Sequence, residues 1–315
     1  MSISAHNGML GGHVGALKDR SSDVVFGMKL SLYAILIGAF SYLDLFGGTA
    51  VRVVGVVGLG LMFAHGVELQ HQVLHHLGFR NRKLNDCVGV LLGLPMLVSY
   101  AGYQASHLRH HRQIGTPDNK EFFDYGDQYG YARPRWWRSA WLWFHRFLMI
   151  GHYAQFLRTL ATVMLGRNVP RETSRVSRRI CGDYLAMLAF MTLLAAASWE
   201  MGDLLVVWLW VAPLCLVAAP VHAMIEMPEH YRCDTSNTDV FANTRTIRSN
   251  ALMAWFTNCN NFHVEHHLMP GLPMERLPDL HEAIAPKLRH FHPTYVEFFK
   301  AVTTRSQSSA VRTDN

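Results

Sequence analysis

The stretch NNFHVEHHLMPGLP, from Asn260 to Pro273, carries three histidines within five positions. Residues three and four apart share one face of a helix, so His263 and His267 would point the same way, with His266 alongside. Imidazole is among the commonest metal ligands in proteins. The stretch therefore predicts part of a metal site, whose other ligands must come from elsewhere in the chain.

Histidine is frequent in this chain, with 19 among 315 residues, and nine of them form four groups. The groups are His71 and His75; His107, His110 and His111; His230; and His263, His266 and His267. The spacing HxxHH occurs twice, which chance would rarely give. Nine imidazoles suit two metals with four or five nitrogen ligands each and a position open for a small ligand. Imidazole accepts zinc, copper, iron or nickel, so the ligand type alone does not choose the metal.

Other polar residues near these groups have weaker signals. Glu226 lies four positions before His230, and Asn260 lies three before His263, so both are predicted to lie just outside the ligands. His65, His76 and His222 are close enough in sequence to be further candidates. The histidines expected to have structural roles are His6, His13, His145, His152, His281, His290 and His292.

The composition indicates a membrane protein. Hydrophobic residues make up 50% of the chain and charged residues 17%, against about 25% charged in soluble domains. The net charge of +6 comes from Lys and Arg beside apolar runs, which is typical of cytoplasmic flanks of membrane helices, and no nucleic-acid partner is expected. The five cysteines have no paired spacing and predict neither a disulfide framework nor a thiolate zinc site. The N-terminal residues do not resemble a signal peptide.

Four apolar runs are each about as long as a bilayer core is thick. They are Met28–Phe46, Ala50–Gln70, Asp183–Trp199 and Asp203–Met224. Short connections make each pair a helical hairpin. Basic residues flank the outer ends of both hairpins, which places both termini and the middle segment in the cytoplasm. The sequence thus predicts an all-α membrane protein with four transmembrane helices as two hairpins.

The histidine groups fall at or beyond the cytoplasmic ends of these runs, so all four can meet just inside the membrane surface. A fifth apolar stretch, Asp86–Tyr103, would separate His75 from His107 if it crossed the bilayer. Gly93 and Pro95 also argue against a straight helix there. We therefore expect it to be re-entrant or interfacial. The Trp- and Arg-rich stretch 133–160 is expected to be an interfacial helix.

The order HxxxH, HxxHH, HxxHH resembles the three histidine boxes of the membrane-bound fatty acid desaturases. The stretches FRNRKLNDCVGVLLGLP, SHLRHHRQIGTPDN and NFHVEHHLMPGLPMERLPDLH also look like that family, and the likeness covers roughly Val51 to His281. The resemblance implies four spans with a cytosolic helical cap and two irons held by the boxes plus one further histidine, which His230 matches. Glu226 matches a position where some members have an asparagine that holds a water on one iron.

The resemblance also implies an oxygen-dependent enzyme that removes two hydrogens from a fatty acyl chain. No haem-binding His-Pro-Gly-Gly stretch occurs, so electrons are expected from a separate ferredoxin or cytochrome b5. The expected organisation is a cytosolic segment 1–27, a desaturase-like domain 28–302 and a disordered tail 303–315. The site is expected to face the cytoplasm.

Two alternatives remain open from the sequence. The same di-iron centre in a hydroxylase would add oxygen to a lipid or a small hydrophobic substrate instead of leaving a double bond. A non-enzymatic membrane protein that binds or carries metal would place its histidines within the spans, whereas here they lie at the span ends. The sequence therefore favours desaturation, and it leaves the substrate, the acyl carrier and the oligomeric state undetermined.

Overall fold

The computed structural model of the chain describes residues 23–120, 122–123 and 136–303. These residues are mostly helical, and their one sheet is a parallel pair of two-residue strands, β1 (Thr246–Ile247) and β2 (Phe291–His292). The predicted all-α class is confirmed. The expected tail beyond Thr303, most of the expected segment 1–27, and both His6 and His13 lie outside the described residues.

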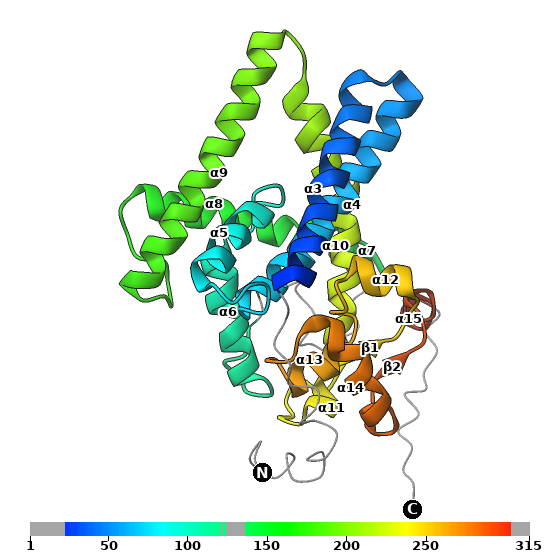
Figure 1. Ribbon diagram of the computed structural model, residues 1–315. Coiled ribbons are helices and arrows are strands. Elements are labelled where there is room, and N and C mark those ends of the chain that lie inside the picture. The colour runs from blue at the N-terminus through cyan, green and yellow to red at the C-terminus, as the bar shows by residue number, and fades with distance from the viewer. Residues whose placement is uncertain (1–22, 121, 124–135, 304–315) are drawn as a thin grey trace, which may run out of the picture.

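Within the described residues, four helices are long and apolar enough to cross a membrane, as the sequence predicted. They are α3 (Asp23–Phe46), α4 (Thr49–Leu74), α9 (Ser174–Met201) and a continuous helical stretch, Val207–Glu229. The last stretch comprises two π-helical segments (Val207–Val211 and Pro213–Ala218), α10 (Ala219–Glu226) and a 3-10 turn (Met227–Glu229). Figure 1 shows two hairpins with their tips at the same end of the molecule. A helix pairs its backbone N–H and C=O groups with one another, as the bilayer interior requires.

Helix α4 is the central span, and glycines set how closely its neighbours approach. A Cβ on Gly60 would lie 2.4 Å from the Cβ of Val217 on the last span. A Cβ on Gly58 would lie 2.2 Å from the ring of Phe40 on α3. Small residues at such crossings let membrane helices pack backbone against backbone. This packing fixes the position of the C-terminal end of α4, where His71 and His75 lie.

The apolar stretch Asp86–Tyr103 is not a fifth span. It forms α5 (Arg82–Gly93), a turn, and the start of α6 (Tyr100–Gln113), as its central proline suggested. Ser99 caps α6, and its hydroxyl donates a hydrogen bond of 2.7 Å to the Asp183 carboxylate on α9. This contact anchors α6, which carries His107, His110 and His111, to a membrane span.

The stretch 133–160 differs from the single helix expected from the sequence. Its described part contains two helices, α7 (Trp136–Phe147) and α8 (Ile150–Met164). The helix is interrupted at Met149, which has a φ of +47° and is buried in the main core. Residue types alone do not signal this break, because a methionine ordinarily continues a helix. Burial of its side chain offsets the strained backbone.

The C-terminal third folds as a cap on the end of the bundle opposite the hairpin tips (Figure 1). Its helices are α11 (Val240–Asn243), α12 (Ala251–Phe256), α13 (His263–Leu268), α14 (Leu277–Ile284) and α15 (Tyr295–Thr303), with 3-10 turns at Met274–Arg276 and Ala285–Lys287. The cap has a small apolar core of its own. Lys29 of α3 joins it to the spans through an ion pair of 3.1 Å with Glu275.

Candidate metal centre

Four separate elements bring the nine singled-out histidines to one place. His71 lies in the last turn of α4 and His75 directly follows that helix. Helix α6 carries His107, His110 and His111, His230 follows the turn after α10, and α13 carries His263, His266 and His267. Seven of the nine side chains are buried, and His75 and His111 are partly buried. The described residues thus place every predicted ligand in one cluster between the spans and the cap.

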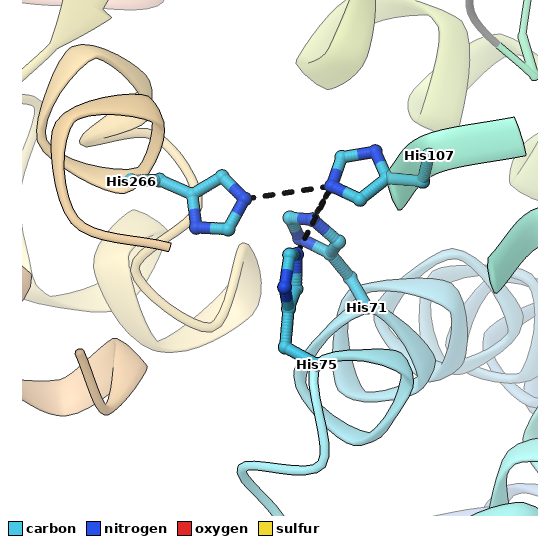
Figure 2. Close-up of side chains that lie close together, drawn as sticks. All are labelled: His71, His75, His107 and His266. Atoms are coloured by element: carbon cyan, nitrogen blue, oxygen red, sulfur yellow. Dashed lines mark hydrogen bonds between the residues drawn. The ribbon is translucent and has the colours of Figure 1, made fainter. Parts of the chain in front are cut away.

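The first half of the cluster gathers around His107. Its Nε2 lies 2.8 Å from Nε2 of His71, 3.1 Å from that of His75, 2.9 Å from that of His111 and 3.5 Å from that of His266. Figure 2 shows four of these rings pointing toward one another from α4, α6 and α13. We call these five histidines the first group.

The second half of the cluster gathers around His267. Its Nε2 lies 3.3 Å from Nε2 of His110 and 3.1 Å from that of His263. The ring centre of His230 lies 5.0–5.2 Å from the ring centres of these three residues. These four histidines are called the second group. The two groups adjoin, since the rings of His111 and His267 are 4.3 Å apart.

These separations fit metal coordination. Nitrogens bound about 2.1 Å from one ion and roughly at right or tetrahedral angles lie about 3.0–3.4 Å apart. The Nε2 separations in both groups, 2.8–3.5 Å, fall close to that range. Both groups therefore form histidine clusters able to hold metal ions.

Outer hydrogen bonds orient three of the four rings of the second group, those of His110, His230 and His263. In each case Nδ1 faces an oxygen, so Nδ1 carries the proton and Nε2 keeps a lone pair for a metal. These contacts are His110 with Asn119 Oδ1 (2.7 Å), His230 with the Asn243 carbonyl (2.8 Å) and His263 with Asn260 Oδ1 (3.1 Å). The donor set of the second group is therefore prepared for a cation.

The rings are also held in the neutral form that metal binding needs. Burial, followed by the charges of neighbouring imidazoles, lowers the pKa of His107, His263 and His266 well below the ordinary value of 6.5. The same causes act on His111 and His267. An added proton would meet both a poorly solvating environment and its neighbours' charge. These histidines are therefore neutral at neutral pH, as metal binding would require.

A cavity of about 10 Å³ is lined by histidines of both groups. Its walls are His71, Tyr103, His107, Phe122, Phe123, Glu226, Glu229, Asn260 and His263. A cavity of this size has room for about one water molecule. A small ligand there would touch histidines of both groups.

Residues 48–299 match the family model of the fatty acid desaturases. The chain belongs to the fatty acid desaturase family. The resemblance read from the histidine boxes is thereby confirmed, and the protein is a desaturase, an oxidoreductase of this family. Its four long apolar helices make it an integral membrane protein.

Several desaturases are distantly similar to this chain. The dihydrorhizobitoxine desaturase of Bradyrhizobium elkanii is 26% identical over 79% of this chain and 69% of its own length. The sn-1 acyl-lipid omega-3 desaturase (ferredoxin) of Synechocystis is 25% identical over 77% of this chain and 71% of its own. The fatty acid desaturase of Bacillus subtilis is 23% identical over 67% of this chain and 62% of its own.

Asn260 and Glu226, predicted to lie just outside the metal ligands, differ from each other in their contacts. Asn260 bridges His263 and Glu229, accepting from the first and donating to the second over 2.9 Å. Glu226 lies 3.4 Å from the hydroxyl of Tyr103 and 3.8 Å from Nδ1 of His222. Glu226 also forms a third potential metal-binding group with His222 and Glu68.

The remaining histidines of the desaturase lie around the cluster or away from it. His65 contacts the Phe256 carbonyl at 2.7 Å, and His76 lies just beyond the end of α4 with a φ of +58°. His281 pairs with Glu265 of α13, and His152 contacts the Met96 carbonyl. His145, His290 and His292 lie outside the two groups. None of these is among the nine clustered rings.

Sequence reasoning missed Glu229, which lies directly before His230 and lines the cavity. The helical spacing rule favoured Glu226 instead, because Glu226 is four residues before His230. That rule assumes a continuing α-helix, but the chain tightens into a 3-10 turn at Met227–Glu229. The tighter turn brings Glu229 to the cavity in addition to Glu226. A proline at position 228 was the one local sign of this change.

Proposed function

We propose that this desaturase holds two irons at its nine-histidine cluster and introduces a double bond into a fatty acyl chain, using O2. In the proposal His71, His75, His107, His111 and His266 hold one iron. The other is held by His110, His230, His263 and His267. The observation that carries the proposal is the convergence of Nε2 atoms from four distant chain segments in two adjoining groups.

The bound irons would activate O2 and accept electrons, chemistry that no side chain of the chain can supply. The protein's own groups would position the reacting carbon and exclude water. Phe122 and Phe123 line the cavity beside Tyr103, and Phe123 is buried. Their rings are suited to pack against methylenes of an acyl chain.

The orientation and electron donor are further parts of the proposal. Basic residues flank the outer ends of both hairpins, which supports a cytoplasmic active site within a desaturase domain spanning residues 28–302. The Synechocystis relative is named as a ferredoxin enzyme. We infer that electrons come from a separate protein of the ferredoxin or cytochrome b5 type. Membrane lipid would supply or surround the acyl substrate.

The test is lipid profiling of a heterologous host that expresses the wild-type chain. A matched pair of variants, His107→Ala and His145→Ala, separates loss of a proposed ligand from loss of any histidine. We expect a new acyl species two mass units lighter with wild type and His145→Ala, and none with His107→Ala. A product sixteen units heavier would indicate the hydroxylase instead. An unchanged lipid profile with folded, iron-loaded enzyme would contradict an acyl-lipid substrate.

A further inference from the structure

The carboxylate of Glu229 lies against the second group, next to His263. Glu229 ends the 3-10 turn after α10, and its side chain is almost fully buried beside His230. Its Oε2 lies 3.1 Å from Nε2 of His263. Its Oε1 accepts a hydrogen bond of 2.9 Å from Nδ2 of Asn260. One carboxylate oxygen is thus fixed by an amide, and the other faces a predicted metal-binding nitrogen.

The hydrogen-bond directions decide what lies between Glu229 and His263. A carboxylate can only accept, so the Asn260 amide must direct its NH2 toward Glu229 and its oxygen toward His263. Nδ1 of His263 faces that oxygen at 3.1 Å and carries the proton. Nε2 of His263 therefore presents a lone pair toward Oε2 of Glu229 and toward Nε2 of His267, 3.1 Å away.

Electron-rich atoms meet at this point from Glu229 and His263. Lone pairs held this close repel one another unless a cation lies between them. An oxygen and a nitrogen bound to the same ion at about 2.1 Å and at right angles would lie about 3.0 Å apart. The observed 3.1 Å agrees with that separation.

We propose that Glu229 is a tenth ligand, which binds the second metal through Oε2 together with His110, His230, His263 and His267. This inference rests on the proposed di-iron function. The two metals would then be unlike, one held by five neutral imidazoles and the other by four imidazoles and an anion. An anionic ligand stabilises a higher metal charge in a buried site, so the second iron would be oxidised more easily than the first.

Asp44 provides a matched control for this role. It is also a buried acidic residue, with 1% of the residue exposed, and it lies near the C-terminal end of α3, away from the histidine cluster. Its carboxylate lies 3.7 Å from Nε of Arg52. Changing Asp44 to Asn therefore removes a buried carboxylate without removing the proposed ligand.

The experiment uses the full chain, purified in detergent after growth on 57Fe. Wild type, Glu229→Gln, Glu229→Asp and Asp44→Asn are compared by iron content and Mössbauer spectroscopy. For wild type we expect two irons per chain and two unequal quadrupole doublets. Glu229→Gln should change one doublet and lower the affinity of that iron at least tenfold. Asp44→Asn should keep two irons and both doublets, and Glu229→Asp should hold the iron better than Glu229→Gln.

The outcomes separate this inference from the proposed function. Two irons with unchanged doublets in Glu229→Gln would show that Glu229 only pairs with His263, and the di-iron proposal would stand. Equal doublets in wild type would also overturn the tenth ligand. Wild-type protein without iron would overturn the proposed function itself. If Glu229→Gln does not fold, Glu229→Asp decides, since a shortened carboxylate should also shift one doublet.

Discussion

Glu265 and His281 form a buried pair that braces the helix carrying the last histidine group. Oε1 of Glu265 lies 2.5 Å from Nδ1 of His281, and Oε2 accepts a hydrogen bond of 2.5 Å from the Thr246 hydroxyl. Glu265 is fully buried and stands between His263 and His266. It therefore ties α13 to both α14 and β1, and this fixes the directions of the two neighbouring imidazoles.

Replacing Glu265 with Ala should weaken both stability and metal binding. Thr246 and His281 would keep buried polar atoms without partners, which costs about 2–4 kcal/mol. Without the contacts of Glu265 to His281 and Thr246, α13 should position its histidines less well, and the protein should bind iron tenfold to a hundredfold less tightly. Thermal unfolding and iron content measure both effects. Glu282→Ala, an exposed change on the same α14 helix as His281, should alter neither, and a normal iron content in Glu265→Ala would refute the bracing role.

Gly60 should tolerate no larger side chain, because α4 and the last span touch there. A Cβ on Gly60 would lie 2.6 Å from the Pro213 carbonyl as well as 2.4 Å from Val217 Cβ. Gly60→Ala should therefore lower the free energy of unfolding by about 1–3 kcal/mol. Gly38→Ala on α3, where nothing lies within 4 Å, is the matched control and should be neutral or slightly stabilising. Equal thermal midpoints for both variants would contradict the close packing.

Acid should destabilise the enzyme through its histidines. Burial lowers the pKa of His75 to about 3 and that of His107 well below 6.5. The unfolded chain binds protons at these residues near pH 6.5, whereas the folded chain does not. The stability they contribute is therefore fully present above about pH 6.5 and is lost as the pH falls toward the folded pKa values.

Iron retention reports the same competition, since protons and metal bind the same nitrogens. We expect dialysis at pH 5 to release iron and lower the thermal midpoint relative to pH 7.5. Iron retained equally at both pH values would show that protonation does not compete at this cluster. Reloading iron at pH 7.5 controls for irreversible unfolding.

The sequence predicted the spans and the ligand positions because each has a local pattern. Hydropathy marks Met28–Phe46 and its partners, and repeated histidine spacing marks α6 and α13. The contacts that orient these rings have no such pattern. Asn119 reaches His110 from a loop, and the Asn243 carbonyl reaches His230 across a turn, so both depend on tertiary structure. The break at Met149 and the 3-10 turn before His230 were missed for the same reason.

The most direct test of the account is the iron content of purified wild type, His107→Ala and His267→Ala, measured by mass spectrometry with protein concentration from amino-acid analysis. The nine-histidine centre predicts two irons per chain in wild type and fewer in each variant, with His145→Ala unchanged. Wild-type enzyme that is fully active without iron, or variants that keep two irons, would contradict it.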